Sequence, residues 1–327
     1  MEITPGIDPS TLSKTVRPQD DLYRFMNGTW IEGTEIPADQ ALYGSFTILR
    51  DNSEEAVRDI LEEAAANPSA GVSQKIGDMY GSFLDEARAD ELGAAPIQGD
   101  LTRIKHIGSL DEVTKLLGEL STQGISGLTG MYVDNDPGNP ERYLVNLYQG
   151  GLGLPDEAYY HEEKHAEIRD AYVPFVAEMF ELAGWAIDEA NEVAHRIFEF
   201  ETAISKHHWT KVESREAEKT YNLRSFDELQ KISANYDWKL WLQGAELDTK
   251  VLEEVVVMMP SFVEAFSTLY VEENLEVIKL WLCWQVINSM APYLSSDFVN
   301  ARFDFYGRKL TGAPELRARW KRAVQAV

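Results

Sequence analysis

Residues 168–184 of this chain read IRDAYVPFVAEMFELAG. Apolar side chains recur in this stretch at intervals of three and four residues, from Ile168 to Phe180. That spacing places them on one face of an α-helix, which predicts an amphipathic helix packed on a core. Gly184 follows the last apolar residues and is typical of a helix end. The stretch therefore predicts a fold built from packed helices.

Similar apolar stripes recur along most of the chain. The further segments with helical spacing are residues 57–64, 76–83, 113–120, 193–204 and 274–293. Two expected helices begin with a serine that is followed three residues later by a glutamate, at Ser109 with Glu112 and at Ser225 with Glu228. This spacing is typical of a capping box, in which each side chain binds the other residue's backbone N–H. We therefore expect the chain to be mainly α.

Strands are expected in one part of the chain. Residues 128–133 and 143–148 are rich in β-branched and aromatic residues, and the turn-forming segment DNDPGNP lies between them at 134–140. We expect a β-hairpin with a long loop there. Residues 255–259 read VVVMM and fit either a buried strand or a helix turn, because periodicity cannot separate the two in so short a run.

The composition describes a folded and strongly acidic protein. The chain has 327 residues, of which 44% are hydrophobic, and this length favours two domains or subdomains. The polar segment 206–219 indicates a boundary near residues 205–225. Lys and Arg number 30 and Asp and Glu number 55, so the net charge is −25. A surface this acidic argues against nucleic acids and anionic membranes as partners.

The chain has one cysteine, Cys283, in the apolar run LWLCW at 280–284. A thiol among tryptophans is expected to be a small core residue, and an internal disulfide is excluded. Residues 1–30 contain no long apolar run, and we expect neither a signal peptide nor a membrane span. These features together favour a cytoplasmic protein.

The sequence HEEKH at residues 161–165 matches the pattern H-E-x-x-H. On a helix this spacing places two imidazoles one turn apart, where they can bind zinc while the glutamate activates a water molecule. The candidate metal site therefore consists of His161, Glu162 and His165. The two histidines also continue the apolar stripe that leads to Ile168.

Several observations lead us to reject that site. Lys164 would place an ammonium group beside a dication, and the glycine-rich segment 150–156 places the motif in the first, solvent-exposed turn of a helix. No downstream glutamate has an aspartate four residues further on, so the expected third ligand is missing. The adjacent His207 and His208 would diverge by about 100° on a helix. We interpret the motif as a polar helix start and predict that this chain binds no metal by itself.

Longer blocks of sequence follow one another in a fixed order. They are DDLYRFMNGTW (20–30), IPAD (36–39), YGSF (43–46), ILRD (48–51), GLGLP (151–155) with YY (159–160), FETAI (200–204), KTYN (219–222), APYL (291–294), FDFY (303–306) and ELRARWKR (315–322). Together these blocks resemble the amino-terminal half of the neprilysin family of zinc endopeptidases, the M13 peptidases. The resemblance covers nearly the whole chain.

The resemblance implies a mainly α, two-lobed helical architecture in which neither lobe is complete. Residues 1–222 would form the amino-terminal part of the larger, catalytic-type lobe, and residues 223–327 would begin the smaller helical lobe. The family's zinc helix, its E-x-x-x-D helix and its late catalytic histidine follow the region that this chain matches. The GLGLP block comes well before the zinc helix in the family's order, so HEEKH directly after it is in the wrong place for that helix.

The resemblance also implies a substrate-binding position. Family arginines in the Y-G-x-F-x-x-L-R region lie near the S2′ side of the cleft and hold a peptide carboxylate, which suits the bidentate geometry of a guanidinium. Arg50 matches the second of these arginines, and Phe46 matches a neighbouring apolar wall. The first arginine falls at Leu42, and this departure favours a pure endopeptidase subsite or a weaker role. The alternative for Arg50 is an ion pair on a helix surface.

Two functions of different classes follow from the sequence. In the first, the chain is the non-catalytic amino-terminal half of an M13-type zinc endopeptidase. It forms cleft and chamber walls for peptide substrates with a carboxy-terminal half that carries the zinc in a split, heterodimeric enzyme, and alone it is inactive. In the second, the chain is a stand-alone peptide-binding or regulatory module derived from such an enzyme. A fragment of a longer protein is a third possibility.

Overall fold

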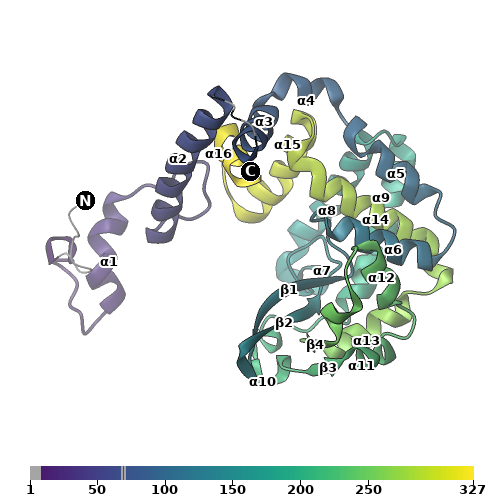
Figure 1. The fold of residues 1–327 in the computed structure, drawn as a ribbon. Helices are drawn as coiled ribbons and strands as arrows, with labels where there is room; N and C mark the ends of the chain where they lie inside the picture. The colour runs from purple at the N-terminus through teal and green to yellow at the C-terminus, as the bar shows by residue number, and fades with distance from the viewer. Residues whose placement is uncertain (1–8, 68, 70) are drawn as a thin grey trace. The chain divides into compact units, whose positions relative to one another are not determined.

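The computed structural model describes residues 9–67, 69 and 71–327. The chain divides into two compact units. Unit 1 contains the described part of Met1–Leu84 together with Thr311–Val327, and unit 2 contains Asp85–Leu310. Most described residues lie in helices, and one small sheet lies in unit 2 (Figure 1). The prediction of a mainly α fold is therefore confirmed.

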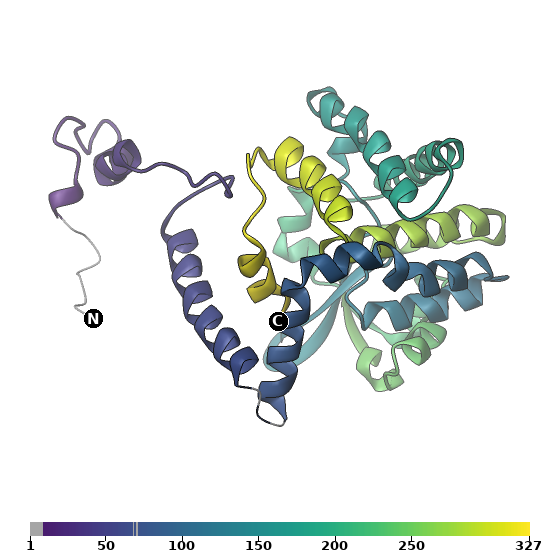
Figure 2. The ribbon, with the colours of Figure 1, turned by 90° about the horizontal axis from the view of Figure 1, so that it is seen from above.

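Unit 1 is built from helices. They are η1 (Pro9–Thr11), α1 (Leu22–Gly33), α2 (Ser45–Ala66), α3 (Val72–Leu84) and α16 (Arg319–Ala326). Figure 2 shows α2 and α3 as a helical hairpin, and α16 contacts both. Leu61, Tyr80 and Ala323 form its small buried core. Gly77 permits close packing, because a Cβ there would lie 2.6 Å from the carbonyl oxygen of Ala64.

Unit 2 contains the remaining elements. Its helices are α4 (Glu86–Leu92), η2 (Ala95–Ile97), α5 (Gln98–Lys105), α6 (Leu110–Ser121), α7 (Ala158–His161), η3 (Glu163–His165), α8 (Ala166–Leu182), α9 (Ile187–Ser205), η4 (Glu213–Arg215), α10 (Ala217–Thr220), α11 (Phe226–Ile232), α12 (Trp238–Gly244), η5 (Thr249–Leu252), α13 (Pro260–Leu269), η6 (Glu272–Asn274), α14 (Leu275–Met290), η7 (Ala291–Tyr293), α15 (Ser296–Arg302) and the π-helix η8 (Phe303–Leu310). Its strands are β1 (Thr129–Asp136), β2 (Asn139–Gln149), β3 (Leu223–Ser225) and β4 (Glu254–Val257).

The core of unit 2 forms around α14. This helix contacts α5, α8 and α9, and its Trp281 and Trp284 side chains are fully buried. A helix that is apolar on every side is typical of the centre of a core. Cys283 is buried in the same helix, as predicted. The chain leaves α8 through Gly184, whose φ of +101° is the left-handed conformation that favours glycine after a helix.

The sheet of unit 2 is mixed, with strand order β1-β2-β4-β3. β1 and β2 form an antiparallel hairpin, β2 pairs with β4 in parallel, and β4 pairs with β3 in antiparallel fashion. The segment 255–259 thus begins in a strand, which resolves the alternative that its sequence left open. The deciding factor is the pairing of 255–257 with 145–147, a contact between distant parts of the chain.

The predicted hairpin is confirmed, but its turn is shorter than predicted. Residues 134–136 belong to β1 rather than to a loop. The side chain of Asp136 is buried, and its carboxylate accepts hydrogen bonds from Gly138 N–H, Arg142 Nε and Tyr221 Oη, each 2.8 Å long. Because these partners replace water around the carboxylate, a polar residue can end the strand inside the protein.

The two predicted capping boxes have different outcomes. At α11, Ser225 Oγ accepts from Glu228 N–H at 3.3 Å, and the Glu228 carboxylate accepts from Ser225 N–H at 2.8 Å, so that box is complete. At α6, Ser109 Oγ accepts from Glu112 N–H at 3.4 Å. The Glu112 carboxylate instead binds the N–H of Gly108 at 2.9 Å, so this cap is shifted by one residue.

The two units differ from the division predicted after residue 222. Position 222 lies inside unit 2, directly before β3. β3 pairs with β4, and β4 pairs with β2 from the earlier part of the chain. The sheet therefore joins residues from both sides of the predicted boundary. The assignment of 1–222 and 223–327 to a larger and a smaller lobe of a complete enzyme stays a prediction.

Candidate functional site

The HEEKH motif does not form a continuous helix. α7 ends at His161, and Glu162 has an extended backbone with ψ of 138° before η3 begins. The two imidazoles are therefore not one helical turn apart, and the expected polar start of a single helix is replaced by two short pieces. His161 Nε2 lies 3.4 Å from the Glu157 carboxylate, and the His165 ring stacks on Tyr159 with centroids 3.8 Å apart.

The donor groups around the motif do not fit a zinc site. Glu162 forms an ion pair with Lys164, so the carboxylate that would activate water is held by an ammonium group. Across residues 9–67, 69 and 71–327, no group of three or more His, Cys, Asp or Glu side chains converges as metal ligands would. His207 is exposed, whereas the ring of His208 binds the Gly150 carbonyl oxygen at 2.9 Å.

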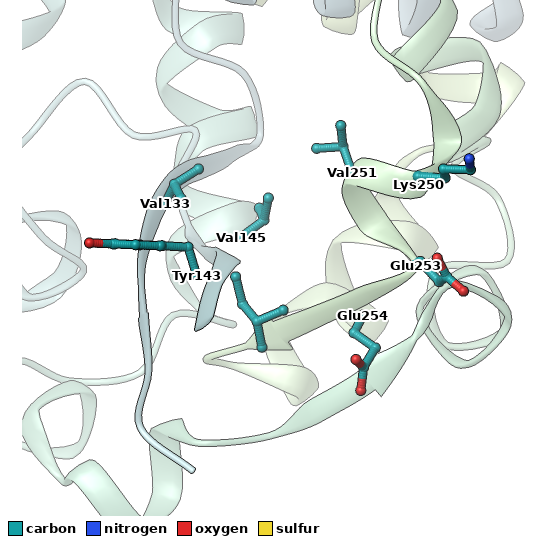
Figure 3. A pocket seen from close by; sticks show the side chains of 8 residues that line it. Val133, Tyr143, Val145, Lys250, Val251, Glu253 and Glu254 are labelled. Atoms are coloured by element: carbon teal, nitrogen blue, oxygen red, sulfur yellow. The ribbon is translucent and has the colours of Figure 1, made fainter. Parts of the chain in front are cut away.

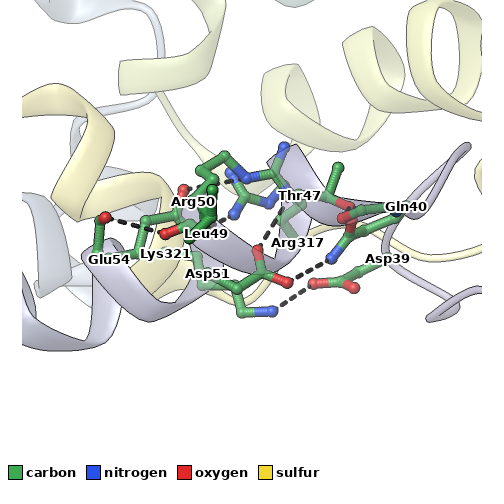
Figure 4. A network of polar contacts seen from close by, with 11 residues as sticks. Asp39, Gln40, Thr47, Leu49, Arg50, Asp51, Glu54, Arg317 and Lys321 are labelled. Atoms are coloured by element: carbon green, nitrogen blue, oxygen red, sulfur yellow. Dashed lines mark hydrogen bonds and ion pairs between the residues drawn. The ribbon is translucent and has the colours of Figure 1, made fainter. Parts of the chain in front are cut away.

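Arg50 lies on α2 within a network of charged side chains, drawn in Figure 4. Its guanidinium lies 3.1 Å from the Asp51 carboxylate and 3.7 Å from the Glu54 carboxylate. Glu54 also pairs with Arg317 at 2.5 Å, and Lys321 pairs with Asp39 at 2.9 Å. The helix-surface ion pair considered for Arg50 is therefore present, and the wider network fastens α2 to the segment around α16.

Phe46 lies next to Arg50 on α2. The two residues are four positions apart on this helix and therefore share one face. The Phe46 side chain is 90% exposed, and Leu49 and Leu42 are also strongly exposed. The structure thus brings the two predicted substrate-binding residues together, on an apolar surface of unit 1 that no described residue covers.

A hollow lies beside the hairpin, as Figure 3 shows, and the sequence had not indicated it. Its volume is about 310 Å³. The side chains that the β1–β2 hairpin contributes to its wall are apolar or aromatic, and Lys250 and two glutamates supply the charge. The lining consists of Val133, Tyr143, Leu144, Val145, Lys250, Val251, Glu253 and Glu254. The continuous apolar run at 143–145 was the available signal. The second wall comes from residues 250–254, which follow about one hundred residues later, roughly the length of a whole domain.

A buried carboxylate joins three of the quoted sequence blocks. Glu201 of FETAI is fully buried, and its Oε2 atom accepts from the hydroxyls of Tyr160 at 2.7 Å and Tyr172 at 2.9 Å. Tyr160 Oη in turn accepts from the N–H of Leu154 in the GLGLP block at 3.1 Å. Burial raises the pKa of Glu201 to about 7. Because Tyr160 is bound to both Leu154 and the buried Glu201, the cluster fixes the GLGLP loop to the core.

The chain was compared with known proteins. The family model described as Peptidase family M13 matches residues 18–327. Endothelin-converting enzyme-like 1 of Mus musculus is 26% identical over 314 residues, which cover 89% of this chain and 40% of that protein. Neutral endopeptidase of Lactobacillus helveticus is 29% identical over 314 residues, which cover 94% of this chain and 48% of that protein.

A solved structure agrees with the fold. The Mycobacterium tuberculosis zinc metalloprotease Zmp1, solved in complex with an inhibitor, matches with a TM-score of 0.92 at 40% identity, over 100% of this chain and 50% of that chain. The chain thus spans about half the length, or less, of the proteins it matches. Since the family model covers almost all of the sequence and the fold agrees throughout, this chain belongs to peptidase family M13.

Proposed function

We propose that this chain is the non-catalytic amino-terminal half of an M13-type zinc endopeptidase. It supplies cleft and chamber walls for a peptide substrate, and a carboxy-terminal half with the H-E-x-x-H helix supplies the zinc. The observation that carries this proposal is the uncovered apolar surface of unit 1. None of the residues of α1 is buried, and its Leu22 and Tyr23 are 61% and 68% exposed. Surfaces of this kind mark interaction sites.

This half is proposed to be inactive by itself, because it lacks a cluster of metal-binding side chains among the described residues. Residues that could bind zinc do not converge in the part of the chain that the structure describes. We propose that the two halves assemble as a heterodimer, in which the carboxy-terminal half covers the exposed faces of α1 and α2. A cytoplasmic location stays a prediction. Among the described residues, no helix has the length and apolar character needed to cross a membrane.

Arg50 and Phe46 are proposed as substrate contacts within this assembly. Arg50 is held by the neighbouring carboxylates Asp51 and Glu54 at a partly exposed position, where ion pairs contribute little stability. Glu54 has a second and closer partner in Arg317, so it remains paired when Arg50 turns away. Arg50 can therefore exchange these ion pairs for a peptide carboxylate at little cost, with Phe46 as the adjacent apolar wall.

Complementation tests the assembly. The chain, a carboxy-terminal M13 half that carries the H-E-x-x-H helix, and their mixture are each assayed on a fluorogenic peptide, with zinc present. We expect activity from the mixture alone. Full activity of the carboxy-terminal half by itself would contradict the proposal. Peptide binding by this chain as a stable monomer, with no gain on mixing, would favour the stand-alone binding module instead.

Arg50→Gln tests the substrate contact in the active mixture. The control is Arg58→Gln on the same helix, because Arg58 forms a comparable exposed ion pair with Glu62 at 2.6 Å. We expect R50Q to lower kcat/KM for a peptide with a free terminal carboxylate by roughly tenfold and to affect the amidated peptide less. Equal losses for both peptides, or equal effects of R50Q and R58Q, would remove Arg50 from the substrate site.

A further inference from the structure

A pocket of about 380 Å³ lies in unit 2 beside the GLGLP block. Its walls come from the base of the β1–β2 hairpin and the loop before it, residues 150–153, α14, the last residue of α15 and the first turn of η8. Among the described residues that line it, Arg302 is the charged one. The π-helix η8 begins directly after Arg302, and π-helical segments are frequent at functional sites.

Arg302 lacks a counter-charge. Its Nε donates to the carbonyl oxygen of Asn288 at 3.3 Å, and its guanidinium lies 5.0 Å from the centroid of the Tyr306 ring. Within the described part of the chain, no carboxylate forms an ion pair with it, although acidic residues outnumber basic ones by 55 to 30. Burial lowers the pKa of Arg302, yet a guanidinium stays charged at any ordinary pH. A partly buried guanidinium without a counter-charge is suited to an anionic ligand, because it can donate two parallel N–H···O bonds to a carboxylate.

Two amide side chains of α14 that line the pocket also have a buried group without a hydrogen-bond partner. Gln285 is 7% exposed, and its Nε2 has no hydrogen-bond partner among the described residues. The orientation of Asn288 is fixed, because Tyr306 Oη donates to Gly153 O at 2.9 Å and therefore accepts from Asn288 Nδ2 at 3.0 Å. Asn288 Oδ1 is consequently the free, buried acceptor. Buried amides without partners are uncommon.

The glycine-rich loop does not satisfy these groups. The carbonyl oxygen of Gly150 is bound by His208 Nε2 at 2.9 Å, and that of Gly151 by Trp281 Nε1 at 3.0 Å. Gly153 O is bound by Tyr306, as described above. The loop is therefore fixed with these acceptors occupied. The pocket offers a guanidinium and an amide N–H as donors, together with one amide oxygen as acceptor.

We propose that this pocket binds a carboxylate whose carrier presents an N–H group next to it, as in the last residue of a peptide or an N-acylated amino acid. Arg302 and the Gln285 amide bind the carboxylate, and Asn288 Oδ1 accepts the N–H. An acidic residue in the rest of a longer M13 protein offers the same chemistry as a ligand from solution. The inference rests on unit 2 alone and does not depend on the proposed function.

N-acetylglycine is the probe, since it carries both groups. Ligand-observed NMR titrations of the 327-residue chain compare it with N-acetylglycinamide, which lacks the carboxylate, and with acetate, which lacks the N–H. We expect the acid to bind roughly tenfold or more tightly than the amide, and acetate to bind more weakly than N-acetylglycine. Equal binding of acid and amide, or no saturable binding of N-acetylglycine, would overturn the proposal.

Variants locate the binding in this pocket. Arg302→Gln is expected to abolish the preference for the acid, and Gln285→Leu to weaken binding several-fold. Arg308→Gln is the matched control, because Arg308 lies nearby on η8 but is exposed and paired with Asp304. Arg302→Lys keeps the charge and is measured in case the glutamine variant does not fold, with retained acid preference expected. Wild-type affinity in folded R302Q would refute the site.

The source of the carboxylate is tested by adding the carboxy-terminal M13 half. If the ligand comes from solution, N-acetylglycine binds the chain equally well with and without that half. If an acidic residue of the other half occupies the pocket, the chain alone binds the probe and the assembled protein does not. Both results support the pocket's chemistry, whereas unchanged probe binding by folded R302Q, measured on this chain alone, refutes it.

Discussion

At the scale of single residues, the ionisation of the fully buried Glu201 and of the half-buried His208 is expected to act on stability. Both are placed around the GLGLP block, Glu201 through Tyr160 and His208 through the Gly150 carbonyl. Burial disfavours the charged form of each group, so it shifts the pKa of the acid upward and the pKa of the base downward. It raises the pKa of Glu201 to about 7 and lowers that of His208 to about 4.

Glu201→Gln is predicted to remove a stability loss that occurs as pH rises. The folded pKa of about 7 exceeds the ordinary value of 4.5, so the folded state holds a proton that the unfolded state releases. The free energy of unfolding of the wild type then falls between pH 4.5 and 7, by up to about 1.4 kcal/mol for each unit of pH. Melting temperatures measured across this range should show E201Q gaining several degrees on the wild type with rising pH. A constant difference between the two would contradict the prediction.

His208→Gln is predicted to act in the opposite direction. The folded pKa of about 4 lies below the ordinary 6.5, so stability is present above pH 6.5 and is lost as pH falls towards 4. Glutamine can keep the hydrogen bond to the Gly150 carbonyl but does not titrate in this range. Urea unfolding at pH 7 and pH 5 should show a smaller acid-induced loss for H208Q. His207→Gln, at an exposed neighbour, should retain the wild-type loss.

At the scale of elements, two glycines set the contact between α6 and α12. A Cβ on Gly118 would lie 2.0 Å from the carbonyl oxygen of Trp241, and one on Gly244 would lie 1.9 Å from that of Lys115. Each obstacle is helix backbone, which cannot move like a side chain. The helices can therefore approach this closely only if both positions lack a side chain.

Gly118→Ala is predicted to destabilise unit 2 by about 1–3 kcal/mol or more, since it forces α6 and α12 apart in a packed region. Gly99→Ala in α5 is the control, because nothing lies within 4 Å of a Cβ at that position. Alanine there should be neutral or stabilise the helix by up to about 1 kcal/mol. Chemical denaturation of both variants measures the difference. Equal stability of G118A and G99A would show that the close contact is not formed.

At the scale of the whole molecule, the uncovered apolar surface of unit 1 should be directly observable. The double variant Phe46→Ser, Leu49→Ser is expected to bind less of a fluorescent hydrophobic dye than the wild type, with the melting temperature nearly unchanged, because both side chains are exposed. Leu61→Ser on the same helix removes a buried side chain and should cost about 3 kcal/mol. If the double variant binds as much dye as the wild type, Phe46 and Leu49 are not part of the apolar surface that binds the dye.

Periodicity in the sequence located the elements better than it located the sites. The stripe at 168–180 became α8, and the aromatic strands at 143–148 became part of β2, because local side-chain spacing determines which face is apolar. Spacing failed at 161–165, where the extended backbone of Glu162 interrupts the helix that H-E-x-x-H requires. It also gave no warning of Arg302, whose contacts are the Asn288 carbonyl on α14 and the Tyr306 ring on η8.

The sequence by itself determined the helical class, the N-terminal serines of α6 and α11, the position of the hairpin and the membership in family M13. These features depend on the spacing of neighbouring residues and on the order of motifs along the chain, and both are visible in the sequence. Only the tertiary structure decided that residues 255–257 form a strand, that α6 and α12 meet at two glycines, and that Arg302, Gln285 and Asn288 share a pocket. Those features arise from contacts between distant segments, whose geometry is set by packing and not by local spacing.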